Sequence, residues 1–96
     1  MPAYLIVDTH IHDTVAYDRY KGLAKPIAEK HGGEYLARGG ALEILEDELW
    51  SPIRLVVIRF PDMAAARAFV EDPDYAPVKA IRHGAAKSTI AIIDGI

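Results

Sequence analysis

The chain has 96 residues, of which 51% are hydrophobic and 26% are charged, a composition that indicates one folded domain over residues 1–96 and argues against disorder. Its net charge is −3, and its basic residues are scattered, which argues against a nucleic-acid partner or an anionic membrane surface. The absence of cysteine excludes disulfides, thiolate metal ligands and a cysteine nucleophile.

The N-terminal residues lack the pattern of a signal peptide, and no apolar run approaches the roughly 20 residues of a membrane span, so we expect a cytoplasmic location. The first strand is predicted over Tyr4–Ile11, which is rich in β-branched and aromatic residues. Its more apolar face carries Leu5, Val7, Thr9 and Ile11. The other face carries Tyr4, Ile6, Asp8, His10 and His12.

The periodicity becomes helical from Thr14 to about Lys30, after Asp13 as the N-cap. Residues at spacings of three and four predict one buried stripe, formed by Tyr17, Tyr20, Ala24, Ile27 and His31 with Leu23 beside them. Pro26 is expected to kink or divide this helix, because proline removes one backbone hydrogen bond. The run His31-Gly32-Gly33 predicts its end.

A second strand is predicted over Glu34–Arg38, followed by a bulge or tight bend at Gly39-Gly40. Residues 41–46 are expected to continue as an extended arm, and residues 47–52 as an acidic loop. This loop carries the only tryptophan, Trp50, which is typical of an interface anchor. The run Ile53–Phe60 predicts a central strand that is covered on both faces.

Asp62 is expected to cap a helix over Met63–Glu71, whose predicted inward side chains are Met63, Ala66, Phe69 and Val70. A short helix is predicted from Asp72-Pro73 to His83-Gly84, and a last strand over Ser88–Asp94. The order β-α-β-β-α-β predicts an α+β ferredoxin-like sandwich, with right-handed crossovers and both helical segments on one face of a four-stranded antiparallel sheet. The bare face favours a homodimer, which would enclose a pocket.

Several motifs are spread over nearly the whole chain. They are Met1-Pro2-Ala3-Tyr4, Ile6-Val7-Asp8, Asp13 with Tyr17 and Tyr20, Arg38-Gly39-Gly40, Arg54–Ile58 with Phe60-Pro61, Ala64–Phe69, and Tyr75 followed by Arg82. Together they resemble the bacterial family of domain of unknown function 1330. The resemblance implies a dimeric α/β-barrel, an arrangement also used by cofactor-free monooxygenases, and it implies no activity. Asp72 departs from the small polar residue usual in the family, and His10 and His12 are particular to this chain.

Arg38 beside Gly39 and Gly40 is the first candidate for ligand binding. A guanidinium at a strand end suits a carboxylate or phosphate, and glycines let a ligand approach the backbone. The alternative is that Arg38 pairs with a structural acid, Glu43 or Asp8, and that the glycines only make a bulge.

Asp8 and His10 are the candidates for an acid/base pair, provided that their strand face is the uncovered one. With His12 they also have a metal-ligand spacing, although ordinary surface histidines are the alternative. Tyr75 and Arg82 lie seven residues apart and are positioned to hold an anion at the mouth of a pocket.

Tyr17 and Tyr20, at helical spacing, are expected to be core residues with their hydroxyls at the rim.

Three hypotheses of function stay open. The first is a dimeric domain that binds a small acidic or aromatic metabolite between sheet and helices through Arg38, with Asp8 or His10 as proton acceptor in a cofactor-free reaction. The second is a non-catalytic dimeric module for sensing or association. The third is a weak metal site at Asp8, His10 and His12. This site is the least favoured, so no metal or other cofactor is predicted.

Overall fold

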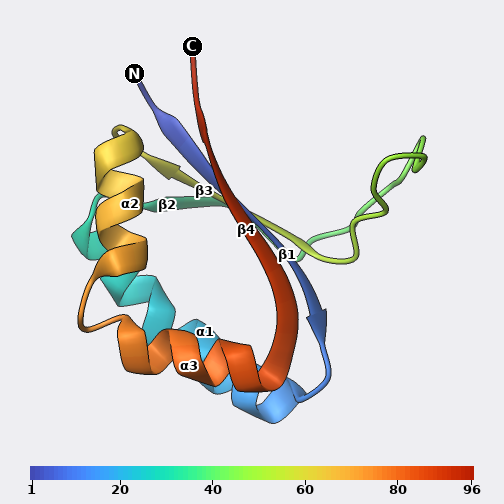
Figure 1. The fold of residues 1–96 in the computed structure, drawn as a ribbon, viewed down its shortest axis with the longest axis horizontal. Helices are drawn as coiled ribbons and strands as arrows, with labels where there is room; N and C mark the ends of the chain where they lie inside the picture. The colour runs from blue at the N-terminus through green and yellow to red at the C-terminus, as the bar shows by residue number, and fades with distance from the viewer.

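The computed structural model describes residues 1–96, and its elements follow the predicted order (Figure 1). They are β1 (Ala3–Ile11), α1 (Thr14–Lys30), β2 (Glu34–Arg38), β3 (Leu55–Phe60), α2 (Met63–Glu71), α3 (Ala76–Ala85) and β4 (Ala86–Asp94). The strands pair antiparallel in the order β2-β3-β1-β4, and the helices lie on one side of this sheet. The predicted ferredoxin-like α+β fold is confirmed. No helix combines the length and the hydropathy that a transmembrane span requires.

Local signals set the helix ends as predicted. The carboxylate of Asp13 accepts from the Ala16 amide at 3.0 Å, and that of Asp62 accepts from the Ala65 amide at 2.8 Å. Gly32 ends α1 with a φ of +82°, which a residue without a Cβ adopts at little cost. Pro26 does not divide α1. Both Pro26 and Gly22 are exposed, so water can solvate the Gly22 carbonyl that Pro26 leaves without a backbone donor.

Side chains from distant elements shift several predicted boundaries. β3 begins at Leu55 and not at Ile53, because the amides of Ile53 and Arg54 donate to the Asp8 carboxylate at 2.8 and 3.0 Å. α3 begins at Ala76 and not at Pro73, because Asp72 accepts from the Asp74 amide and residues 73–75 form a turn. β4 begins two residues earlier than predicted, directly after α3.

The chain bends at Gly39, whose φ is +71°, so the predicted tight bend is confirmed. The β-bulge lies earlier, between Tyr35 and Ala37, where the pairing of β2 with β3 shifts. In the stripe of α1, Ala28 is fully buried, whereas Leu23 is 41% exposed.

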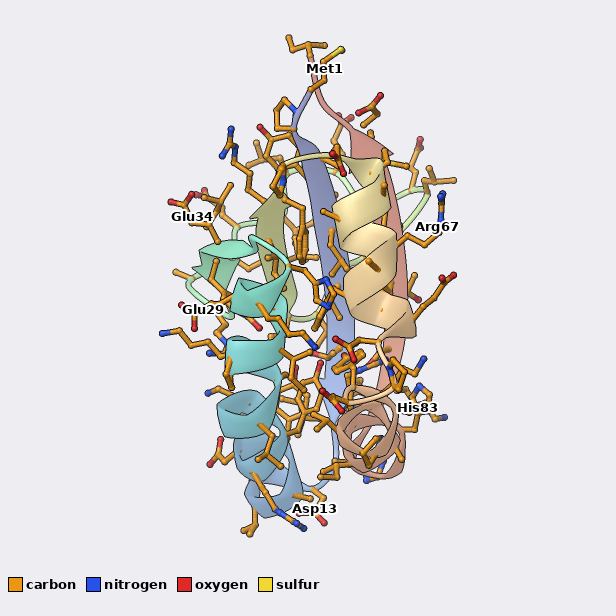
Figure 2. The ribbon with its side chains drawn as sticks, turned by 90° about the vertical axis from the view of Figure 1, so that its left-hand side faces the viewer. Met1, Asp13, Glu29, Glu34, Arg67 and His83 are labelled. Atoms are coloured by element: carbon orange, nitrogen blue, oxygen red, sulfur yellow. The ribbon has the colours of Figure 1, made fainter.

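The core lies between the helices and the face of β1 that carries Leu5, Val7 and Thr9, as the alternation predicts. Figure 2 looks onto the helices, with α1 lying across from α2 and α3 and with labelled charged side chains such as Glu29 and Arg67 at the periphery. Aromatic rings run through this core: Phe69 lies 5.7 Å from Phe60 and 4.5 Å from Tyr75 between ring centroids.

The opposite face of the sheet is uncovered. On β3, Leu55 and Val57 are partly exposed on this face, so the predicted cover on both faces is wrong for the single chain. Residues 39–54, which we call the arm, leave the sheet on the side away from the helices (Figure 1). Half of the chain's exposed large hydrophobic side chains lie in the arm, namely Leu42, Ile44, Leu45, Leu49, Trp50 and Ile53. The arm contains no strand.

Candidate functional site

A cavity lies between the helix-facing side of the sheet and the helices. Its apolar lining comes from all layers of the fold and consists of Leu5, Val7, Val56, Ile58, Phe69 and Ile90. Four tyrosines and two cations, Lys21 and Arg38, complete the lining. Lys21, Tyr35 and Arg38 are partly exposed, so they mark the mouth at the edge formed by β2 and α1. The free volume is about 20 Å³, which is the space of one water molecule.

Each of the four tyrosine rings has a cation near it. The distances from the cationic group to the ring centroid are 4.4 Å for Arg38 over Tyr35, 5.1 Å for Arg54 over Tyr17, 5.9 Å for Arg82 over Tyr20 and 5.9 Å for Lys79 over Tyr75. None of these four cations has a carboxylate within ion-pair distance. The surroundings of the cavity are therefore both aromatic and positively charged, a combination that attracts an aromatic anion.

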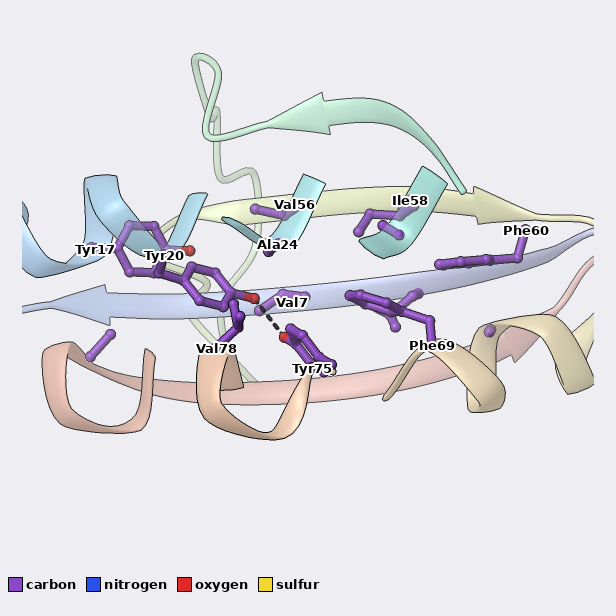
Figure 3. Packing of buried hydrophobic residues seen from close by; sticks show 14 of the residues in the cluster. Val7, Tyr17, Tyr20, Ala24, Val56, Ile58, Phe60, Phe69, Tyr75 and Val78 are labelled. Atoms are coloured by element: carbon purple, nitrogen blue, oxygen red, sulfur yellow. Dashed lines mark hydrogen bonds between the residues drawn. The ribbon is translucent and has the colours of Figure 1, made fainter. Parts of the chain in front are cut away.

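Three of the tyrosine hydroxyls make hydrogen bonds inside the protein. The hydroxyl oxygens of Tyr20 and Tyr75 lie 2.6 Å apart (Figure 3), and Arg54 Nη1 donates to the Tyr17 hydroxyl at 3.1 Å. Burial, reinforced by the neighbouring Tyr75, raises the pKa of Tyr20 well above its usual range. Burial also raises the pKa of Tyr35. Both phenols thus remain protonated at neutral pH, and each keeps a hydroxyl proton that can be donated.

Arg38 lies at the mouth of the cavity, on the side of the sheet where a ligand was predicted. Its Nη2 donates to the Lys21 carbonyl at 2.7 Å, and it pairs with neither Glu43 nor Asp8. The alternative of a structural ion pair is therefore wrong.

The glycines that follow Arg38 have different surroundings. Gly39 has a φ of +71°, and a Cβ there would meet the Arg54 guanidinium at 2.5 Å, so this glycine makes room for Arg54. Gly40 has open space around it.

Tyr75 and Arg82 are not at the mouth, which corrects the prediction of an anion site there. They are 1% and 4% exposed: Tyr75 is the N-cap residue of α3 and contacts Tyr20 of α1 and Phe69 of α2, and Arg82 is a buried residue of α3. Nε of Arg82 has no hydrogen-bond partner, and its Nη2 reaches only His83 Nε2, at 3.4 Å. Arg82 is thus a buried guanidinium without a counter-charge.

Asp8, His10 and His12 lie away from this cavity. Asp8 and His10 are on the uncovered face of the sheet, and His10 and His12 are exposed. Burial alone would raise the pKa of Asp8, but hydrogen bonds from Arg54, Ile53 and Trp50 outweigh it and lower that pKa. Asp8, His10 and His12 do not come together as a group of metal ligands, and no other three such side chains do so in this chain.

Sequence reasoning missed Arg54 and Lys79 as cations beside the cavity. Strand alternation contained a signal for Arg54, because it lies two residues before Val56 and four before Ile58, so that the alternation places it on the same face as these two buried residues. Helical spacing contained one for Lys79, which lies four residues after the buried Tyr75.

Comparisons with known proteins agree with this fold. A sequence profile of the family described as "Domain of unknown function (DUF1330)" matches residues 2–96. The crystal structure of RPA0582, a protein of unknown function from Rhodopseudomonas palustris, aligns with a TM-score of 0.76 at 18% identity, over 99% of this chain and 82% of that chain. Among curated proteins, no sequence matches this chain at a significant level.

Two further solved structures are similar. A dimeric ferredoxin-like protein of unknown function from Jannaschia sp. aligns with a TM-score of 0.69 at 17% identity, over 99% of this chain and 100% of that chain. SnoaB, a cofactor-independent oxygenase from Streptomyces nogalater, aligns with a TM-score of 0.71 at 9% identity, over 99% of this chain and 93% of that chain. At these identities the likeness shows the shared fold alone.

Proposed function

The chain belongs to the DUF1330 family, a domain of unknown function, and from this premise we propose that it is a homodimer that binds a small aromatic acid in the cavity between its sheet and its helices. The observation that carries the proposal is the set of four cations beside the cavity's tyrosines, none of them paired with a carboxylate. Arg82 is the buried one of the four, at 4% exposure, and a buried cation without a counter-charge is costly; an anionic ligand would supply the missing charge.

The carboxylate of the ligand binds at the mouth, at Arg38. A guanidinium offers two parallel donors to a carboxylate, and Lys21 on the neighbouring helix adds a second positive charge. Because the free volume is only about 20 Å³, Arg38 and Tyr35 move aside when the ring enters. Arg38 is suited to this movement, since a single hydrogen bond to a carbonyl holds its guanidinium.

We propose binding, and not proton abstraction, as the primary role of the cavity. Its lining contains no carboxylate and no imidazole, and Asp8 and His10 lie on the other face of the sheet. A cofactor-free reaction, of the kind named for the neighbour SnoaB, would here require the ligand's own anion as the base.

The uncovered face of the sheet supports the homodimer. The apolar and aromatic side chains on this face include Tyr4, Ile6, Val57, Ala91 and Ile93. Asp8 lies between two hollows on this face, one of about 270 Å³ beside His10 and Lys87 and one of about 310 Å³ beside Trp50. A second copy on this face would enclose both hollows. The dimeric Jannaschia neighbour has the same fold.

Thermal-shift measurements with benzoate and 4-hydroxybenzoate test the binding proposal. We expect these acids to raise the melting temperature of the wild type, and we expect Arg38→Gln to weaken their affinity by about 10- to 100-fold, since a hydrogen bond to a charged group contributes about 1.5–3 kcal/mol. Arg67→Gln is the matched control, because Arg67 is exposed on α2 and far from the mouth (Figure 2). It should bind like the wild type.

The same measurements distinguish the alternative, a non-catalytic module for association. The exposed apolar arm favours that module. If none of the acids changes the melting temperature of the wild type, the binding site is rejected and the non-catalytic association module remains.

A further inference from the structure

The inner end of the cavity contains hydroxyl protons that have no acceptor. In the Tyr20–Tyr75 pair one hydroxyl donates to the other, so the accepting hydroxyl keeps a proton of its own. Neither hydroxyl has a second partner within hydrogen-bond distance. The Tyr17 hydroxyl accepts from Arg54, and its proton likewise finds no acceptor. Figure 3 shows Tyr17, Tyr20 and Tyr75 side by side in the core.

Arg82 adds positive charge behind this group of donors. Its guanidinium is 5.9 Å from the centroid of the Tyr20 ring, it is 4% exposed, and Nε is without a partner. No carboxylate or imidazole side chain lines the cavity to balance these donors. The inner end therefore offers hydrogen-bond donors and positive charge only, so its complement is an oxygen with negative or partial negative charge.

The size of the free space agrees with such an oxygen. About 20 Å³ accommodates one oxygen atom with its immediate surroundings, and Tyr17, Tyr20 and Tyr75 are among the residues that line it. A substituent of this size on an aromatic ring would reach the hydroxyl pair only from the mouth, where the carboxylate is held.

We propose that the Tyr20–Tyr75 pair, with Arg82 behind it, is an oxyanion-binding site that receives the phenolate, enolate or carbonyl oxygen of an aromatic acid. The ligand class is therefore narrower than aromatic acids in general: it consists of hydroxy- or oxo-substituted aromatic acids. The proposal rests on the proposed function, since Arg38 holds the other end of the same ligand. Donors placed before the ligand arrives favour the ionised oxygen, because they need not reorient when charge develops.

The test uses two fluorinated probes that differ only in the hydroxyl, 3,5-difluoro-4-hydroxybenzoate and 3,5-difluorobenzoate. The fluorine chemical shift reports the ionisation of the phenol, free and bound, as the pH is changed. In the wild type we expect the phenol pKa to fall by about one unit on binding, and the hydroxy probe to bind about tenfold more tightly above that pKa.

The variants distinguish the contribution of the tyrosine pair from that of Arg38 at the mouth. The double variant Tyr20→Phe/Tyr75→Phe keeps both rings and should remove the pKa shift and the preference for the hydroxy probe. Tyr4→Phe, on the uncovered face, should keep both. Arg38→Gln should weaken both probes alike. The double variant's melting curve checks its folding. If it does not fold, the single variants Tyr20→Phe and Tyr75→Phe take its place, and each should reduce the pKa shift; an unchanged wild-type pKa rejects the site without any variant.

Three outcomes would overturn the oxyanion site, each for a different reason. A bound phenol pKa that is unchanged or raised, with binding that still depends on Arg38, would overturn the oxyanion site and leave the proposed function intact. Failure of both probes to bind the wild type would overturn both. A lowered pKa that persists in the double variant would assign the effect to other groups and reject the tyrosine pair.

Discussion

Three arginines beside the cavity lie at different depths, and only Arg82 is buried. Arg38, Arg54 and Arg82 each lie against a tyrosine ring, and none of them has a carboxylate partner. A cation–π contact contributes about 0.5–2 kcal/mol, whereas desolvating an unpaired charge costs several kcal/mol. For Arg82, the most buried of the three, the contact does not offset that cost, which supports a ligand-binding role over a stabilising one.

Asp72 has the opposite arrangement, a buried carboxylate surrounded by donors. It accepts from His31 Nε2 at 2.7 Å, from the Asp74 amide at 2.8 Å and from Lys30 Nζ at 3.0 Å. These hydrogen bonds, with that from His31 the largest contribution, hold the pKa of Asp72 far below its usual range. They join the end of α1 to the turn between α2 and α3.

The sign of the pH effect follows from this lowered pKa. The unfolded carboxyl has a pKa of about 3.9, so the stabilisation by Asp72 is complete above about pH 4 and is lost as the pH falls toward the lower folded pKa. Asp72→Asn should therefore lower the melting temperature at pH 7, and the difference from wild type should shrink below about pH 4. Asp18→Asn, an exposed carboxylate of α1, is the control and should change little. An equal loss at pH 7 and pH 2.5 would contradict this account.

At the scale of elements, two glycines of one helical segment should respond in opposite directions to the same substitution. Gly22 lies inside α1 with open space around it, so Gly22→Ala should stabilise by about 0.5–1 kcal/mol through helix propensity. Gly32 follows the helix with a φ of +82°, and a Cβ there would meet Pro61 Cγ at 2.9 Å. Gly32→Ala should destabilise by about 1–2 kcal/mol. Urea unfolding measures both, and the same sign for the two variants would refute the explanation.

The start of β3 shows an element boundary that is set from outside the element. The Asp8 carboxylate, on β1, binds the amides of Ile53 and Arg54 and the indole of Trp50, at distances of 2.8 to 3.0 Å. These bonds replace strand pairing and fix the root of the arm. They also occupy Asp8 as an acceptor, so the structure gives this carboxylate an anchoring contact with the arm.

At the scale of the whole molecule, the uncovered sheet face and the exposed arm leave apolar surface that the helices do not reach. We expect light scattering after size exclusion to give twice the 10.6 kDa of the chain. Ile93 is 57% exposed on this face, and Ile93→Glu would place a charge between the two sheets. This variant should elute as a monomer at micromolar concentration.

Val15→Glu is the matched control for this variant. Val15 is 80% exposed on α1, the helices lie on the side of the sheet opposite the bare face, and the replacement of Val15 should leave the dimer intact. A monomeric wild type would contradict the dimer. If Val15→Glu dissociates as readily as Ile93→Glu, the contact between the two copies does not depend on the bare face.

The sequence by itself determined the element order, both carboxylate caps, the glycine that ends α1 and the strand face that enters the core, and with these the ferredoxin-like fold. These features depend on residues within a few positions of one another, so periodicity and local hydrogen bonding are sufficient to predict them. It also pointed to Arg38, which lies on the cavity side of the sheet.

Only the tertiary structure decided which side chains meet. Tyr20 and Tyr75 are 55 residues apart, Arg54 and Tyr17 are 37 apart, and Asp8 and Trp50 are 42 apart. The pairing of Tyr75 with Tyr20 places Tyr75 inside the core and not at the mouth, and the sheet separates Asp8 and His10 from Arg38. Such contacts depend on how whole elements pack, and packing depends on the register and depth of distant segments, which no local pattern contains.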